Sequence, residues 1–244
     1  DKVINYRKKL LQNQILNMKN SIYFLSLIIT FSLYSQDQIK DTIQGTKQNL
    51  NEVIVQSVRV KYSSPITHAN VSKSQLSSKN LGQDLPVLLT FLPSVVTTSD
   101  AGAGIGYTGI RIRGVSAQST NITINGIPFN DPESHGTFWV NLPDFTSSVE
   151  SLQVQRGVGT STNGSGAFGA SINILTDAIS KNPYAEISNS AGSYNTLKHT
   201  VKFSTGQLND SFELSGRLSK IDSDGYVDRA YSDLKSYFVQ GTYN

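Results

Sequence analysis

Residues 108–131 read Thr108-Gly-Ile-Arg-Ile-Arg-Gly-Val-Ser-Ala-Gln-Ser-Thr-Asn-Ile-Thr-Ile-Asn-Gly-Ile-Pro-Phe-Asn-Asp131. Isoleucines alternate with polar residues over 110–113 and again over 122–125. Alternation with a period of two residues predicts half-buried β-strands. The pair Asn125-Gly126 suits the positive φ angles of a tight two-residue turn, so it predicts a hairpin.

The composition favours a β-rich protein. Hydrophobic residues make up 37% and charged residues 16% of the 244 residues, and there are 19 glycines. This balance fits sheets with many turns better than a helical bundle. The sequence contains no cysteine, which excludes disulfides, thiolate metal sites and a lipid-bearing cysteine.

The net charge of +3 does not indicate a nucleic-acid-binding protein. The first 35 residues hold five basic residues and one acid, a net +4, which leaves the remainder at −1. Binding to nucleic acid needs clustered Lys and Arg on the functional part of the chain. We therefore expect no nucleic acid among the partners.

The N-terminal part has the organisation of a secretory leader. Met18 and a lysine precede the apolar run Ile22–Leu33, and the small residue Ser35 follows. The run is too short to cross a bilayer as a helix, which takes about 20 residues; a buried core helix is the alternative. We predict upstream read-through at 1–17, a signal peptide at 18–35 and a polar periplasmic linker at 36–50.

Residues 51–56, Asn-Glu-Val-Ile-Val-Gln, are an isolated β-prone segment behind that linker. They are either the first strand of the next domain or a strand offered to the sheet edge of another protein. Residues 57–178 then alternate short strands, turns and two short helices, which predicts a small α+β domain. One helix is predicted from the apolar spacing over 83–91, ended by Pro93, and another behind a Ser72 or Ser74 cap.

Residues 184–244 carry a different pattern. Runs of about ten residues alternate apolar and polar side chains, with tyrosines near their ends, which is typical of transmembrane β-strands. A short connection at 206–210 and a longer one at 222–233 fit the unequal loops of such barrels. A soluble sandwich would give similar alternation. Only four strands are expected, and because the smallest barrels have eight, we interpret the sequence as a fragment.

Together, these segments resemble TonB-dependent outer-membrane receptors. The resemblance covers 51–176 as a plug domain and 184–244 as the first barrel strands, and it rests on several ordered motifs. They are Asn51–Val55, Gly109-Ile-Arg-Ile-Arg-Gly114, Ile124-Asn-Gly-Ile-Pro128, Asn130-Asp-Pro-Glu-Ser-His-Gly-Thr-Phe-Trp-Val-Asn-Leu-Pro143, Val149-Glu-Ser-Leu-Gln-Val-Gln-Arg-Gly157 and Gly166-Ala-Phe-Gly-Ala170.

The resemblance implies an α+β plug domain followed by the start of an antiparallel transmembrane β-barrel of about 22 strands. It implies import of a scarce nutrient, such as a ferric siderophore, cobalamin or a glycan, across the outer membrane of a Gram-negative bacterium. The implied partners are the TonB C-terminal domain, membrane lipid and the ligand, with the N-terminus in the periplasm. Glu52, Val53, Ile54 and Val55 are then the TonB box, although Glu52 departs from the threonine often found there.

The resemblance also implies two sets of site residues. Arg113 and Arg156 match plug arginines that face carboxylates of the barrel wall, because a charge buried there needs a partner; a solvated arginine in a wet lumen is the alternative. The loops 99–108 and 128–141 would face outward and supply aromatic ligand contacts. The candidates are Tyr107, Phe129, His135, Phe138 and Trp139, and packing explains Phe138 and Trp139 equally well.

Other signals are set aside. Residues 164–169 match the dinucleotide fingerprint by letter, but a strand pattern follows instead of the helix that the fingerprint needs. Asp131, Glu133 and His135 could ligate a metal, but no second cluster supports them. We expect no cofactor, no metal site and no enzyme. A secreted β-rich adhesion or carbohydrate-binding module is the alternative function, and a periplasmic enzyme is the third.

Overall fold

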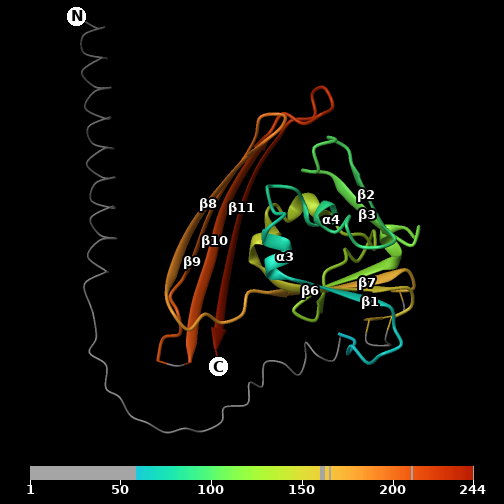
Figure 1. Cartoon of the computed structure of the whole chain (residues 1–244), viewed down its shortest axis with the longest axis horizontal. Coiled ribbons are helices and arrows are strands. Elements are labelled where there is room, and N and C mark those ends of the chain that lie inside the picture. Colours follow the sequence, from blue (N-terminus) through green and yellow to red (C-terminus); the bar gives the residue numbers. More distant parts are fainter. Residues whose placement is uncertain (1–58, 160–162, 165, 210, 244) are drawn as a thin grey trace, which may run out of the picture. The chain divides into compact units, whose positions relative to one another are not determined.

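The computed structural model describes residues 59–159, 163–164, 166–209 and 211–243, which belong to one compact unit (Figure 1). We call residues 59–177 the plug and residues 184–243 the wall. The predicted read-through segment, signal peptide, linker and TonB box lie outside the described residues. Among the described residues, no helix is long and apolar enough to cross a membrane.

The plug contains a five-stranded sheet with the order β1-β6-β7-β4-β5. The pairing of β4 with β7 is parallel and the other pairings are antiparallel. Asn125 and Gly126 have φ angles of 51° and 82°, which confirms the predicted tight turn between β4 and β5. The strands are β1 (His68–Ser72), β4 (Thr120–Ile124), β5 (Ile127–Pro128), β6 (Val149–Arg156) and β7 (Ala170–Thr176).

The first isoleucine pair of residues 108–131, Ile110 and Ile112, lies in a separate two-stranded sheet. Strand β3 (Thr108–Ile112) pairs antiparallel with β2 (Val95–Ser99) and not with the strands of the larger sheet. The chain turns away from β3 at Arg113 and Gly114, whose φ angles of 55° and 76° break the extended conformation. The isoleucines of both pairs still line the same core, as their alternation predicts.

The helices of the plug are short. Helix α3 (Lys73–Ser77) begins at Ser72, whose hydroxyl accepts from the backbone N–H of Gln75, while the Gln75 side chain accepts from the backbone N–H of Ser72. Helix α4 (Leu85–Leu88) is shorter than predicted, because the chain leaves the helical conformation at Leu89. Three single-turn 3-10 helices complete the plug: η3 (Ala117–Ser119), η4 (Trp139–Asn141) and η5 (Phe145–Ser148).

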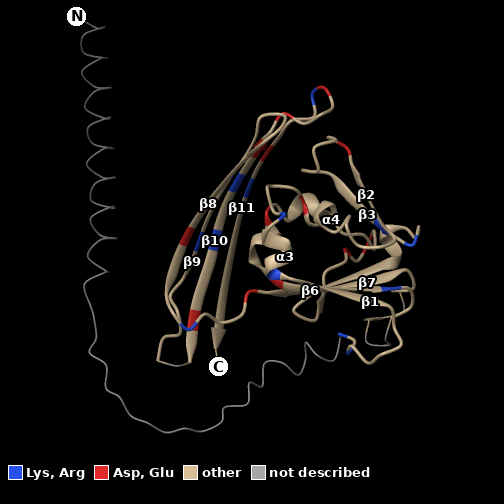
Figure 2. Cartoon of the chain, viewed as in Figure 1, with Lys and Arg blue, Asp and Glu red and all other residues tan. Residues whose placement is uncertain are grey.

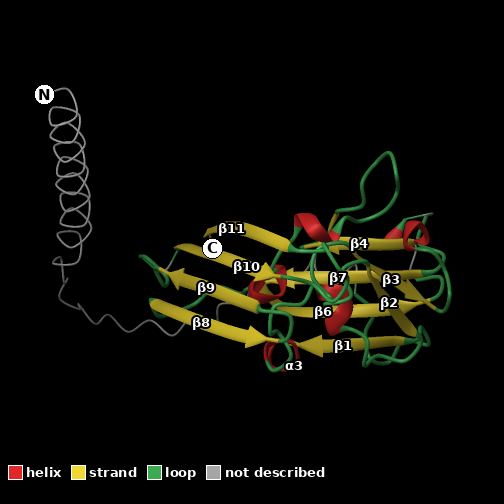
Figure 3. Cartoon of the chain, turned by 90° about the horizontal axis from the view of Figure 1, so that it is seen from above, coloured by secondary structure: helices red, strands yellow, loops and turns green. Residues whose placement is uncertain are grey.

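The wall is a curved antiparallel sheet of four strands in chain order, as Figures 1 and 3 show. The predicted short and long connections are found at 205–211 and 224–231. Gly216 on the third strand makes room for Phe203, since a Cβ there would lie 2.6 Å from the phenyl ring. The strands are β8 (Tyr184–Gly192), β9 (Thr196–Ser204), β10 (Phe212–Ser223) and β11 (Ser232–Tyr243).

The wall has its polar face inside and its apolar face outside. Lys198, Thr200 and Ser219 point toward the plug and are buried, whereas Val201 and Leu218 on the same strands are exposed. A soluble β-sandwich buries its apolar face, so this arrangement is the reverse of the soluble alternative. It is the arrangement of a barrel wall, with lipid outside and a polar lumen inside.

Candidate functional site

A buried polar contact between plug and wall is centred on Asp144. This residue stands directly before η5 and has a left-handed backbone conformation, with φ 52°, which Asp tolerates better than most residues. Within the plug, its Oδ1 accepts hydrogen bonds from Ser147 Oγ at 2.5 Å and Asn80 Nδ2 at 3.3 Å. These contacts fix the carboxylate so that it faces the wall.

On the wall side, Asp144 contacts two cations and two hydroxyl groups. Lys198 Nζ lies 2.7 Å from Asp144 Oδ1, and Arg217 Nη1 lies 3.6 Å from Oδ2. Thr200 Oγ1 and Ser219 Oγ donate to Oδ2 at 2.7 and 2.5 Å. Alternate residues of β9 point to one side of the sheet, and Thr200 pairs in register with Ser219 of β10. The four side chains therefore converge on one carboxylate.

The charges of this network sit in a dry environment. The side chain of Asp144 is 0% exposed, and those of Lys198 and Arg217 are each 3% exposed. Burial alone would raise the pKa of Asp144, but the positive charges of Lys198 and Arg217, together with its hydrogen bonds, outweigh burial and lower the pKa. Asp144 is therefore ionised at neutral pH, and plug and wall are joined by a buried ionic network.

A second ionic contact lies where the plug continues into the wall. Asp177 binds Lys73 of α3 at 2.6 Å and Lys202 of β9 at 2.5 Å, and Lys73 also lies 3.1 Å from Glu150. Gln240 of β11 donates to the backbone carbonyl of Asp177 at 3.1 Å. Figure 2 colours the positively and negatively charged residues of the plug and of the wall strands. The end of β7 is thereby tied to two strands of the wall.

Apolar and backbone contacts complete the interface. Phe145 and Phe238 meet edge to face with ring centroids 6.0 Å apart, and Phe238 joins the apolar core of the plug. In the glycine-rich loop, the carbonyl of Ala101 accepts from the backbone N–H of Tyr226 at 2.8 Å. Gly102 allows this approach, since a Cβ there would lie 2.9 Å from Tyr226 Cβ. The wall thus contacts the plug at Asp177, at the Asp144 network and at the loop 99–108.

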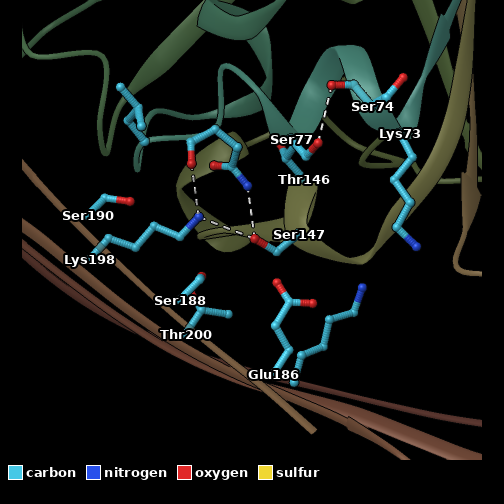
Figure 4. Close-up of a pocket in the computed structure, with 13 residues that line it drawn as sticks. Lys73, Ser74, Ser77, Thr146, Ser147, Glu186, Ser188, Ser190, Lys198 and Thr200 are labelled. Atoms are coloured by element: carbon cyan, nitrogen blue, oxygen red, sulfur yellow. Dashed lines mark hydrogen bonds between the residues drawn. The ribbon is translucent and has the colours of Figure 1, made fainter. Parts of the chain in front are cut away.

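A cavity of about 640 Å³ lies beside the Asp144 network (Figure 4). Its lining is rich in hydroxyls and lysines from α3 and η5 on the plug and from β8 and β9 on the wall. Lys198 crosses from the wall side and donates to Asn80 O at 3.4 Å and to Ser147 Oγ at 3.3 Å. The lining side chains that Figure 4 labels are Lys73, Ser74, Ser77, Thr146, Ser147, Glu186, Ser188, Ser190, Lys198 and Thr200.

The two arginines predicted to pair with wall carboxylates lie at the other end of the plug sheet. Arg113 is exposed at the turn after β3, and Arg156 Nη1 donates to the carbonyl of Pro93 at 3.3 Å. Neither makes an ion pair with a carboxylate among the described residues. Their pairing with carboxylates of the barrel stays a prediction.

Sequence reasoning missed the interface that the structure does describe, in which carboxylates of the plug meet cations of the wall. A signal was present. Lys198, Lys202 and Arg217 fall on the polar side of two alternating strands, where cations facing a lumen need acidic partners.

The five candidate ligand residues are spread over three places. Tyr107 is exposed just before β3, whereas Phe129, His135 and Phe138 lie in the loop after β5. Trp139 is buried in the apolar core, which agrees with the alternative prediction that it serves in packing. The ligand role of all five stays a prediction.

The motifs set aside have structural explanations. Asp131 Oδ1 accepts from the backbone N–H groups of Glu133 at 3.1 Å and Ser134 at 2.7 Å, which makes it the centre of a turn. No group of three potential metal ligands occurs among the residues that the structure describes. Strand β7 follows Gly169 directly, so the glycine pattern before it does not open a helix.

Comparisons with known proteins agree with this architecture. Residues 60–171 match the family described as the TonB-dependent Receptor Plug Domain. The vitamin B12 transporter BtuB of Vibrio vulnificus is 30% identical over 212 residues, which are 84% of this chain and 32% of BtuB. The probable TonB-dependent siderophore receptor PirA of Acinetobacter baumannii is 24% identical over 220 residues, 86% of this chain and 27% of PirA. The chain thus spans between a quarter and a third of the length of these curated relatives.

Solved structures show the same fold. FpvA of P. aeruginosa, bound to heterologous pyoverdines, superposes with a TM-score of 0.61 at 17% identity, over 73% of this chain and 23% of FpvA. The ferric yersiniabactin uptake receptor FyuA from Yersinia pestis superposes with a TM-score of 0.52 at 20% identity, over 73% of this chain and 28% of FyuA.

Proposed function

Because its plug domain places the chain among the TonB-dependent receptors, we propose that it serves in the active import of a scarce nutrient across the outer membrane of a Gram-negative bacterium. The observation that carries the proposal is the wall, whose apolar side is exposed and whose polar side is buried against the plug. Lipid would cover the apolar side, and the plug would close the polar lumen. A secreted adhesion or carbohydrate-binding module would gain nothing from such a wall.

The names of the relatives support a proposal for the substrate class. One is named as a vitamin B12 transporter and another as a probable siderophore receptor. We infer a metal chelate of the siderophore or cobalamin type, with a glycan as the third possibility. It would approach the end of the plug that carries the loop 99–108, where Tyr107 is exposed and Ala101 contacts Tyr226 of the wall connection 224–231.

In this proposal, the plug is a gate fixed to the wall by charge. A passage for the substrate requires part of the plug to separate from the wall or to rearrange beside it. The Asp144 and Asp177 networks resist separation, since each holds a plug carboxylate between cations. Their resistance keeps the lumen closed until work is supplied.

That work would come from TonB. We propose that Glu52, Val53, Ile54 and Val55 pair as an added strand with the sheet of the TonB C-terminal domain, in the periplasm. Pairing through backbone hydrogen bonds needs few specific side chains, which accommodates glutamate at position 52. Arg113 and Arg156 would meet carboxylates of the remaining wall. No step of this mechanism needs a catalytic residue.

The test replaces residues 51–56 by an equally long Gly-Ser sequence in the full-length protein. We expect uptake of radiolabelled substrate by cells to be lost while binding to isolated outer membranes stays unchanged. A matched Gly-Ser replacement of residues 41–46 in the predicted linker serves as the control and should leave both unchanged. A panel of iron chelates, cobalamin and glycans identifies the substrate. Uptake that survives the replacement of 51–56 would overturn the proposal.

A further inference from the structure

One face of the plug sheet is polar, and on it Gln153, Asn173 and Thr123 are buried, whereas Asn70 on the edge strand is exposed. Asn70, Gln153, Asn173 and Thr123 are successive cross-strand partners on β1, β6, β7 and β4. Gln153 Nε2 donates to Asn70 Oδ1 at 2.8 Å, and Thr123 Oγ1 donates to Asn173 Oδ1 at 2.8 Å. We call these four residues the polar ladder. The neighbouring residues of β6, Leu152 and Val154, point the other way into the apolar core.

Residues 59–60, which we call the strap, are hydrogen-bonded to this ladder. The backbone N–H of Val60 donates to Gln153 Oε1 at 2.8 Å, and Gln153 Nε2 donates to the backbone carbonyl of Val60 at 3.0 Å. The amide of Gln153 thus binds the main chain of Val60 as a neighbouring β-strand would. This recognition does not depend on the side chain at position 60.

Arg59 adds a second attachment beside the first. Its guanidinium donates three hydrogen bonds of 3.0 Å, to Ser151 Oγ, to the carbonyl of Ser151 and to the carbonyl of Asn173. Burial lowers the pKa of Arg59 to about 10, so the group stays charged at neutral pH. The attachment therefore joins a cation to neutral acceptors of β6 and β7, and water can replace these acceptors when the strap leaves.

The chemistry of this contact suits reversible docking. If the strap left an apolar face, the exposed surface would cost free energy in proportion to its area. When it leaves the polar ladder, the freed amide and hydroxyl groups gain hydrogen bonds to water instead. Val60 is buried but does not belong to the apolar core cluster. The strap can therefore detach without opening the core of the plug.

We propose that Gln153 and Arg59 are positioning residues that hold the strap on the polar ladder, so that a pull on residues 51–56 first detaches the strap and only then loads β1. The inference rests on the proposed function, in which TonB binds the segment that ends three residues before Arg59. Strand β1 stands at the edge of the sheet and is paired only with β6 among the described strands. Among the described residues, the strap is thus the first attachment of the plug along the path of the pull.

The test uses the full-length protein in lipid vesicles, with a nitroxide spin label on Ser57→Cys as the only labelled thiol and with neither TonB nor substrate present. Electron paramagnetic resonance reports the mobility of the label. The substitution Gln153→Leu keeps the side-chain size but removes both hydrogen bonds to Val60. Loss of one to two net hydrogen bonds should shift the docked-to-free ratio of the strap about five- to thirty-fold toward the free state. Arg59→Ala, at a half-buried position, should act in the same direction.

Thr123→Val is the matched control, because Thr123 belongs to the same ladder and donates a buried hydrogen bond but contacts Asn173 instead of the strap. We expect a mobile label in Gln153→Leu and Arg59→Ala and an immobile label in the control, at comparable thermal stability. A label as immobile in both variants as in the parent protein, or equally mobile in the control, overturns the proposal. Since TonB is absent, this result is independent of whether residues 51–56 drive uptake.

Discussion

Asp144 of the plug and Lys198 of the wall form an ion pair of 2.7 Å in which neither side chain is more than 3% exposed. Arg217, Thr200 and Ser219 add three more contacts from the wall to the same carboxylate. Burying charges is expensive, so such a network persists only when each member keeps its partners. In the proposed function, its two halves belong to the two parts that would separate or shift when a substrate passes. The network would then link the stability of the closed state to the work needed to open it.

Asp144→Asn should destabilise the full-length protein by about 3–5 kcal/mol, because it leaves Lys198 and Arg217 buried without their carboxylate. Urea unfolding of the protein in detergent, followed by tryptophan fluorescence, measures the loss. Asp222→Asn is the control, since its pair with Lys220 of 2.9 Å is 36–46% exposed and solvent screening leaves it little effect on stability. Equal losses in the two variants would contradict a special role for the buried network.

A second buried carboxyl of the plug, Asp84, has a raised pKa, whereas the pKa of Asp144 is lowered. The raised pKa predicts that the stability of the plug falls as pH rises. Asp84 is 2% exposed at the start of α4, and burial raises its pKa to about 7, although hydrogen bonds from Thr108 and Gly106 act against the rise. The folded plug therefore keeps a proton that the unfolded chain releases near pH 4. The stability from this proton is complete below pH 4, and it is lost as pH rises from about 4 to about 7, by up to about 1.4 kcal/mol per pH unit.

Asp84→Asn should remove this pH dependence and stabilise the plug above pH 7, because a neutral amide can still accept from Thr108. Thr108→Val should extend the decline to higher pH, since it removes a hydrogen bond that lowers the pKa of Asp84. The measurement is the free energy of unfolding between pH 4 and pH 8 for the parent and both variants. An unchanged slope in Asp84→Asn would assign the pH dependence to other groups.

Much of the architecture could be predicted from local pattern. The pair Asn125-Gly126 predicts a tight turn from two residues alone. The alternation over 196–204 and 212–223 predicts which side chains share a face of each wall strand. Ser72 carries a helix start, because its partner is only three residues away. In each case the interacting groups are close in sequence, so the residue types alone decide the outcome.

The contacts that sequence could not supply join distant residues. The parallel pairing of β4 with β7 aligns Ile122 with Ile172, and nothing local distinguishes this pairing from a hairpin of β3 with β4. Asp144 lies in an ordinary Leu-Pro-Asp-Phe segment, and its partners on the wall follow more than fifty residues later. The resemblance indicates two cations of the plug, Arg113 and Arg156, whereas the described interface uses carboxylates of the plug.

Gly206, between β9 and β10, packs against Pro183, which precedes β8, and leaves no room for a side chain. Its φ is 66°, and a Cβ would lie 2.6 Å from the backbone nitrogen of Pro183. Gly206→Ala should therefore cost more than the roughly 1–2 kcal/mol of the left-handed conformation alone. Gly114→Ala is the matched control, because its φ of 76° is similar but nothing lies within 4 Å. Unfolding free energies of the two variants separate the contact from the backbone strain, and equal losses would exclude the contact.

The outward face of the wall gives the sharpest division between a membrane wall and a soluble sheet. Leu218 of β10 is 57% exposed and lies in register between Val201 of β9 and Tyr237 of β11. In water, Leu218→Arg would change stability by no more than about 0.5 kcal/mol, because an exposed arginine is fully solvated. In a bilayer, the same charge costs about 2–4 kcal/mol near the midplane.

We expect Leu218→Arg to lower the fraction of full-length protein that reaches its folded form in outer membranes, measured by heat-modifiable electrophoretic mobility. Tyr231→Arg, in the exposed connection 224–231, is the control and should assemble like the parent protein. The comparison holds the introduced charge constant and changes only its position relative to the apolar face. If both variants assembled equally well, the apolar face would not be in contact with lipid, and the transporter proposal would lose the observation on which it rests.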